Sequence, residues 1–219
     1  MVKRFSRQHP VVVIVGLGRF GLALGEELMH SGVEVLGVDA NEAVATKAAP
    51  MLTHVVIADA TDIDALRQLF LEEAQRVVIG IGSDMAASVL AASAIVELGV
   101  PSIWAKADSA PHAKILRQIG VHHVIRPERD TGRRVAHLIA GGLQEYTEFD
   151  RDFAMVKLAP PLSMLGKPVE ATPPGVDIVA VRPAEGRFST PAPGTVITSG
   201  DLIVAAGRIE DLERFGTSG

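Results

Sequence analysis

The residues best suited to chemistry form a glycine-rich turn, GLGRFG at positions 16–21, which directly follows the apolar run Val11–Val15. Between a strand and a helix, Gly16 permits the tight turn, Gly18 lets a pyrophosphate approach the backbone, and Gly21 lets the helix pack close to the strand. The unpaired N–H groups at the start of the following helix point at such a phosphate. The turn therefore predicts a nucleotide-binding site.

An acid follows the turn at the spacing that this kind of site requires. Asp39 ends the next apolar run and stands 18 residues after Gly21. A carboxylate there accepts hydrogen bonds from both ribose hydroxyls and repels a 2′-phosphate. NAD, ADP and ATP share the ribose and the first phosphates, so these features do not distinguish them. The alternative interpretation is a glycine turn with an incidental acid nearby.

Further residues are candidates for the same site, and two of them, Arg19 and Asp59, have both a functional and a structural interpretation. Arg19 and Phe20 fill the two positions before the last glycine and are predicted, with the glycines, to bind the nucleotide. Arg19 projects from the first helical turn. Its guanidinium can reach a phosphate or a neighbouring subunit, or it can remain a solvated surface group. Asp59, which follows the third apolar run, can simply lead into a helix whose N-cap is Thr61 or Asp62.

Other kinds of chemistry lack the residues they need. The chain has no cysteine, which excludes disulfides, thiolate metal sites, iron–sulfur clusters and thiol catalysis. Its seven histidines do not show the spacing of a zinc site. The net charge is −5 and there is no basic stripe. We therefore expect no nucleic-acid partner.

Composition indicates a globular protein, since 47% of the 219 residues are hydrophobic and 21% are charged. No apolar run approaches the ~18 residues of a transmembrane helix. The first ten residues are basic but lack the apolar segment of a secretory signal. We expect a cytoplasmic protein.

Strand and helix patterns alternate through the first part of the chain. Six β-branched or apolar runs predict strands at Val11–Val15, 33–38, His54–Ile57, 77–81, 102–106 and His123–Ile125. Stretches with helical apolar spacing occupy 21–30, 43–48, 62–69, 85–98 and 112–119. Parallel strands need such helix-length connections, so the pattern predicts an α/β fold with a Rossmann-like, doubly wound parallel sheet. Ligands of such sheets bind at the carboxyl ends of the strands.

The remainder of the chain has a different pattern. A helix from about 127 to 143 looks like a connector, and we assign it with the sheet to a first domain, 1–143. Residues 144–219 are rich in proline and carry short strand-like runs at Phe153–Leu158, 177–181 and 202–205, separated by turn clusters. We therefore predict a small second α+β domain over 144–219.

Several segments together resemble the RCK proteins, which regulate potassium conductance in the Ktr and Trk uptake systems. The matching segments are VIVGLGRFGLALGEELMHSGVEVLGVDAN, DATD at 59–62, IGSD at 81–84, WAKA at 104–107, ILRQIGVHHVIRPERDTGRRVA at 115–136, and SGD with a later AAG in the tail. The segment 69–74 departs from the pattern, because it lacks the glycine that many relatives place before the fourth strand.

The resemblance implies a regulatory subunit. Its N-terminal lobe would bind ATP, ADP or NAD(H), and a crossover helix would lead to a C-terminal lobe that binds cyclic di-AMP in several relatives. Such proteins form homo-oligomers, with dimers assembling into a ring that we expect to be an octamer. The ring would sit on a separate integral membrane potassium-translocating subunit, at the inner face of the cell membrane.

The resemblance also implies roles for individual residues. Asp39 would hold the ribose, Asp59 would lie beside the adenine, and Arg19 would reach nucleotide phosphate across the subunit interface. Glu128 would sit near a cation such as Mg²⁺ or Ca²⁺, and Lys106 is a weaker candidate at the end of the fifth strand. Glu128 has a simpler interpretation as well, because the helix dipole stabilises an acid in a first turn.

Two functions fit these observations. The first is a nucleotide-sensing regulatory subunit without catalysis, and the alternative is a small NAD-dependent oxidoreductase. The second would need a proton donor or a metal beside the nicotinamide. Residues 144–219 contain no histidine and no cysteine, and their acids lie among turn signals, so we favour the first.

Overall fold

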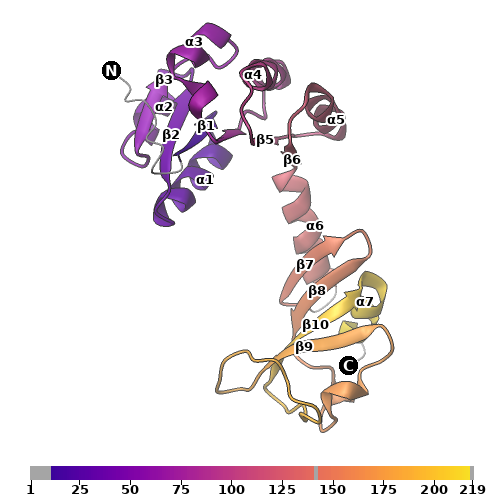
Figure 1. Cartoon of the computed structure of the whole chain (residues 1–219). Helices are drawn as coiled ribbons and strands as arrows, with labels where there is room; N and C mark the ends of the chain where they lie inside the picture. The colour runs from indigo at the N-terminus through magenta and orange to yellow at the C-terminus, as the bar shows by residue number, and fades with distance from the viewer. Residues whose placement is uncertain (1–10, 141–142, 218–219) are drawn as a thin grey trace. The chain divides into compact units, whose positions relative to one another are not determined.

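The computed structural model describes residues 11–140 and 143–217 (Figure 1). The chain divides into two compact units, Met1–Glu128 and Arg129–Gly219. Within the described residues, no helix is both long enough and apolar enough to cross a bilayer.

The first unit contains six parallel strands in the order β3-β2-β1-β4-β5-β6. The strands are β1 (Val11–Val15), β2 (Glu34–Asp39), β3 (His54–Ile57), β4 (Arg76–Ile79), β5 (Ile103–Lys106) and β6 (His123–Ile125). The helices are α1 (Arg19–His30), α2 (Glu42–Ala48), α3 (Ile63–Gln68), α4 (Met85–Glu97) and α5 (Ala110–Ile119). The strand order reverses between β1 and β4, which places the ligand crevice of such a sheet beside these two strands.

Both faces of the central strands are covered, and β1 shows why it is apolar throughout. Val13 and Val15 face a core that includes residues of α3, α4 and α5. Val12 and Ile14 face the opposite core, to which α1 and α2 contribute. A strand buried on both faces is continuously apolar rather than alternating.

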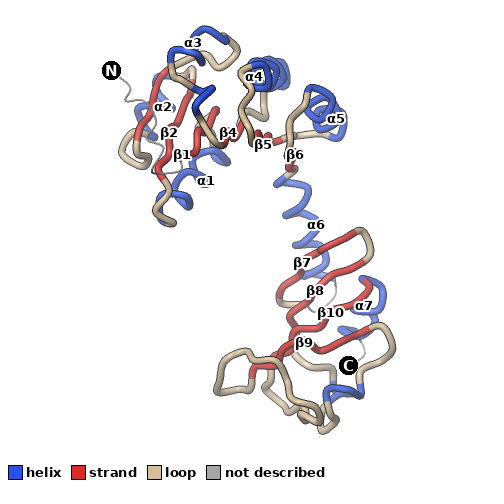
Figure 2. Tube along the Cα trace, viewed as in Figure 1, coloured by secondary structure: helices blue, strands red, loops and turns tan. Residues whose placement is uncertain are grey.

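The second unit is built on an antiparallel sheet in the order β7-β8-β10-β9. Its strands are β7 (Glu145–Asp150), β8 (Phe153–Leu158), β9 (Val176–Arg182) and β10 (Leu202–Arg208), and α7 (Ile209–Thr217) follows the last strand. Figure 2 shows that the long connection between β9 and β10 is mostly loop. Apolar residues of β8, β9, β10 and α7 share one core, which includes Val156, Ile203 and Phe215.

The predicted fold class is confirmed, namely a doubly wound parallel sheet followed by a small α+β unit. Each predicted strand and helix of the first unit is present, with small differences at its ends. Two elements of the second unit were not predicted, β7 and α7. In β7 only Tyr146 is buried, so its sequence, EYTEFD, shows little apolar alternation.

The connecting helix α6 (Pro127–Ala140) crosses the division between the units. Residues 141 and 142 of the predicted helix lie outside the described residues, and Leu143, its predicted last residue, is not helical. Most of α6 groups with the second unit, whereas the sequence assigned the whole helix to the first domain. The domain boundary between residues 143 and 144 stays a prediction.

The segment without the expected glycine adopts the backbone conformation that glycine usually supplies. Phe70, directly after the C-cap of α3, has φ = 56° and ψ = 38°. No other described non-glycine residue has a positive φ. A residue with a Cβ adopts this left-handed conformation at a cost of about 1–2 kcal/mol relative to the right-handed one. The chain therefore keeps the turn before β4 without the glycine.

Two glycines of the second unit predict opposite effects of the same substitution. Gly132 lies inside α6, where an added Cβ would meet nothing within 4 Å, so Gly132→Ala should raise the free energy of unfolding by about 0.5–1 kcal/mol. A Cβ at Gly207 would lie 2.1 Å from the Gly175 carbonyl oxygen, so Gly207→Ala should destabilise the unit by about 1–3 kcal/mol or more. Denaturant melts of the full chain measure both. Shifts of the same sign would contradict this account of the packing.

Candidate functional site

The turn between β1 and α1 is shaped by contacts that exclude side chains. Gly16 has φ = 89°, and its N–H donates to the Val38 carbonyl oxygen at 2.8 Å. A Cβ at Gly21 would lie 2.0 Å from the Gly16 carbonyl oxygen, and one at Gly80 would lie 2.8 Å from the same atom. The backbones of α1 and of the segment after β4 therefore pack against the turn at distances that only glycine permits.

The next glycine has a different environment, which suits a phosphate. Gly18 is the N-cap of α1, and a Cβ there would meet nothing within 4 Å. No side chain caps the helix and no acid lies in its first turn, so its first N–H groups are available to an anion. Arg19 is exposed at this helix start, whereas Phe20 is half-buried and packs against the core under α1.

Asp39, which is predicted to bind the ribose, is held in place by backbone N–H groups at the turn and just after β2. One oxygen of Asp39 accepts the Leu17 N–H at 2.8 Å, and the other accepts the Asn41 N–H at 2.8 Å. Each carboxylate oxygen can accept a second hydrogen bond. Asp39 can therefore accept two ribose hydroxyls without breaking either backbone contact, so these residues fit the ribose and phosphate of a nucleotide.

Asp59 has the local role that the sequence offered as its alternative. Its Oδ1 accepts the N–H of Thr61 at 2.9 Å and the hydroxyl of Thr61 at 2.8 Å. These hydrogen bonds lower the pKa of Asp59. The N-cap of α3 is Asp62, which accepts the Asp64 N–H at 2.9 Å. A contact between Asp59 and adenine stays a prediction.

Lys106 lies between two carboxylates at the carboxyl end of β5. Its ammonium is 2.8 Å from Glu128 Oε1 and 3.2 Å from Asp108 Oδ1, and its side chain is 14% exposed. The hydrogen bond to Glu128 raises the pKa of Lys106, Asp108 adds to this, and partial burial opposes it. The same hydrogen bond lowers the pKa of Glu128, with a smaller contribution from the charge of Arg19.

No described group of three or more His, Asp or Glu side chains is arranged to hold a metal ion. The partner that the structure shows for Glu128 is Lys106. A cation at Glu128 therefore stays a prediction.

Several residues that shape this end of the sheet were not predicted from the sequence. Gly80 and Gly82 follow β4, and Asp108 follows β5 by two positions, as Asp59 follows β3. Two buried polar residues behind them, Ser88 and His112, were not predicted to take part either. The position of an acid just after a strand is a signal that could have singled out Asp108.

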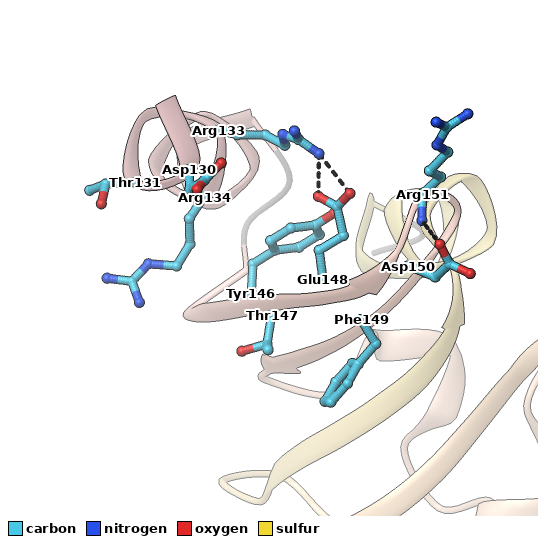
Figure 3. A pocket seen from close by; sticks show the side chains of 10 residues that line it. All are labelled: Asp130, Thr131, Arg133, Arg134, Tyr146, Thr147, Glu148, Phe149, Asp150 and Arg151. Carbon is cyan, nitrogen blue, oxygen red and sulfur yellow. Dashed lines mark hydrogen bonds and ion pairs between the residues drawn. The ribbon is translucent and has the colours of Figure 1, made fainter. Parts of the chain in front are cut away.

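The second unit contains a cavity of about 550 Å³ between side chains of α6 and β7 (Figure 3). Nη1 of Arg133 donates to both oxygens of Glu148, at 2.6 and 2.5 Å. Tyr146 stacks on His137 with ring centroids 4.3 Å apart, and His137 contacts Glu213 at 2.9 Å. The buried Tyr146 hydroxyl has no hydrogen-bond partner in the described part of the chain. No residue predicted for the nucleotide site lines this cavity.

Comparison with known proteins identifies the family of this chain. The TrkA-N domain family matches residues 12–127. Ktr system potassium uptake protein C of Bacillus subtilis (strain 168) is 31% identical over 207 residues, which cover 92% of this chain and 94% of that protein. Ktr system potassium uptake protein A of Vibrio alginolyticus is 34% identical over 199 residues, which cover 89% and 90%. The chain belongs to the RCK family of Ktr and Trk potassium uptake proteins.

Solved structures of RCK proteins share this fold. The GsuK RCK domain has a TM-score of 0.69 at 20% identity, with 99% of this chain and 49% of that chain covered. The GsuK channel bound to NAD has a TM-score of 0.68 at 19% identity, with 98% and 41% covered. The family match and the Ktr relatives confirm the resemblance stated from the sequence, and these structures share its fold.

The glycine turn predicts a contrast between two substitutions in this RCK chain. Gly18→Ala adds a methyl group where a phosphate would lie, so it should weaken nucleotide binding while the melting temperature of the free protein changes little. Gly21→Ala forces a Cβ to within 2.0 Å of the Gly16 carbonyl oxygen, so it should lower the melting temperature itself. Thermal melts with and without ADP measure both effects. Equal loss of stability in the two variants would refute this division of roles.

The ion pair at Glu128 predicts a stability difference that depends on pH. Its pKa lies below the ordinary value of 4.5, so the charged carboxylate stabilises the fold above that pH, and this contribution disappears as the pH falls through the lowered pKa. Since Glu128 is 65% exposed, Glu128→Gln should cost less than about 1 kcal/mol. Melts of both proteins from about pH 7 to about pH 3 should converge at the acidic end. A difference that persists there would contradict the ion-pair explanation.

Proposed function

We propose that this chain is a nucleotide-sensing regulatory subunit of a potassium uptake system. It binds an adenine nucleotide at the turn between β1 and α1 and controls ion flux through a separate membrane subunit. The observation that carries the proposal is the Asp39 carboxylate, which the turn holds beside the uncapped start of α1. The relatives named Ktr system potassium uptake proteins supply the physiological context.

A regulatory role accounts for the chain better than hydride transfer. Both functions use a Rossmann-like sheet, so the fold alone does not decide between them. An oxidoreductase needs a proton donor beside the nicotinamide. The histidine nearest in sequence to the carboxyl end of β5, His112, is buried and hydrogen-bonded to Ser88. The Ktr relatives, which match over nearly their whole length, are named for potassium uptake.

ATP, ADP and NAD(H) are all proposed ligands. Asp39 and the uncapped helix start would contact the ribose and the first phosphates, which these nucleotides share. NAD is bound to the GsuK channel, whose fold this chain shares. Arg19, Asp59, Lys106 and Glu128 are proposed to contact the remainder of the nucleotide or an accompanying Mg²⁺ or Ca²⁺. Cyclic di-AMP is the proposed ligand of the second unit.

We further propose that the chain acts as a homo-oligomer in the cytoplasm, at the inner face of the membrane. Ligand binding can regulate a pore only by favouring one of two arrangements of neighbouring subunits. Dimers that assemble into an octameric ring on the membrane subunit would supply such arrangements. Light scattering that gives the 23.1 kDa of a single chain, with and without nucleotide, would exclude this assembly.

The binding proposal is tested by a thermal-shift panel of ADP, ATP, NAD and NADH. A ligand at a hundredfold excess over its Kd adds about 2.7 kcal/mol to the free energy of unfolding. Asp39→Ala should abolish the shift, because it removes the ribose acceptor. It should also lower the melting temperature without ligand, because the N–H groups of Leu17 and Asn41 lose their acceptor.

Asp64→Ala is the matched control, because it removes an exposed carboxylate of α3 that pairs with Arg67 at 3.0 Å. It should leave the ligand shift unchanged. An unchanged ligand-induced thermal shift in Asp39→Ala would exclude Asp39 as part of the nucleotide site. Turnover of NADH with a carbonyl substrate would replace the regulatory proposal with an enzymatic one.

A further inference from the structure

The ion cluster at the carboxyl end of β5 contains more negative than positive charge. Lys106 is the ammonium of the cluster, and Asp108 and Glu128 both contact it. One cation between two carboxylates leaves these three groups with a formal charge of −1, and the charge of Arg19 acts on Glu128 from outside the cluster. With Asp108 in place, the charge of Lys106 is already matched within the cluster, so its attraction for a phosphate is reduced.

Asp108 is held by buried groups behind it. Nδ1 of His112 accepts the backbone N–H of Asp108 at 3.4 Å, and Nε2 lies 3.2 Å from Ser88 Oγ. Since Nδ1 accepts a hydrogen bond, the proton of the neutral ring is on Nε2, which donates to Ser88. Burial lowers the pKa of His112 and keeps the ring neutral, while the charge of Asp108 opposes this. Helices α4 and α5 thus fix the position of Asp108.

Contacts continue from Asp108 to the phosphate-binding turn. A Cβ at Gly82 would lie 2.5 Å from Oδ1 of Asp108, so the carboxylate rests directly on the segment after β4. A Cβ at Gly16 would lie 2.8 Å from Cγ1 and 3.0 Å from N of Ile81, in the same segment. Residues 80–82 are therefore packed between the glycine turn and Asp108. This places the carboxylate near the carboxyl ends of β1 and β4, the paired strands between which the strand order reverses and beside which such sheets bind their ligands.

We propose that Asp108 determines how much phosphate charge the nucleotide site accepts, by neutralising Lys106 jointly with Glu128. This inference rests on the proposed function, since it concerns the ligand of the same site. In the absence of a divalent cation, the two carboxylates disfavour a nucleoside triphosphate relative to a diphosphate, because the triphosphate carries one more negative charge. Ser88 and His112 are positioning residues for Asp108.

The test is Asp108→Asn, which keeps the shape of the side chain and removes its charge. ADP and ATP are titrated calorimetrically in EDTA at low salt. The affinity of the variant for ATP should rise relative to that for ADP by about threefold to tenfold. The reason is that the additional negative charge of ATP is repelled by one carboxylate instead of two. The gain should shrink at high salt, where screening weakens the charges. Lys106→Gln should move the ratio in the opposite direction.

Two controls separate charge at this site from other effects. Asp64→Asn removes the same charge from α3 and should leave the ATP-to-ADP ratio unchanged. Ser88→Ala removes the acceptor of His112, so it should shift the ratio in the direction of Asp108→Asn and add nothing in the double variant. A lower melting temperature with an unchanged ratio would show that Ser88 only stabilises the fold, and would overturn its positioning role.

The outcomes distinguish this inference from the proposed function. If the wild-type chain binds neither ADP nor ATP, the proposed function fails. If it binds them and Asp108→Asn leaves their ratio unchanged, the proposed function stands and the role of Asp108 is overturned.

Discussion

The carbonyl oxygen of Gly16 is the atom around which the N-terminal unit is arranged. Two other backbones press against it, at Gly21 in the first turn of α1 and at Gly80 after β4. Neither position leaves space for a Cβ, so only glycine lets the helix and the segment after β4 pack this closely against the turn. This packing presents the uncapped start of α1 at the edge of the sheet and lets Asp39 reach the N–H of Leu17.

The sequence predicted those features whose causes are local. The glycine spacing, the apolar run before it and the acid 18 residues after Gly21 all reflect one strand-turn-helix-strand unit. The start of α3 was predicted to within one residue, since the sequence offered Thr61 or Asp62 as its N-cap and the structure shows Asp62. Alternating strands and helices were enough to predict the doubly wound sheet, because parallel strands require such connections.

Features that depend on contacts between distant segments could not be predicted in this way. Lys106 meets Glu128 only because β5 and β6 pair in parallel and α6 starts at the same edge. His112 on α5 meets Ser88 on α4, and these two residues are 24 positions apart in the chain. Strand β7 escaped notice because one face of its sequence is polar and its pairing with β8 is interrupted near Phe149.

Strand β7 forms one edge of the second sheet, and its irregular pairing bears on the colloidal behaviour of the protein. An edge strand has backbone groups that can template a strand of another molecule. Two of the three acids on β7 are neutralised within the chain, since Glu145 pairs with Lys157 and Glu148 pairs with Arg133. Protection of this edge therefore rests on the backbone rather than on charge. The register with β8 shifts between Glu148 and Asp150, and an edge interrupted in this way is poorly suited to docking another strand, which opposes fibre-like growth through this sheet.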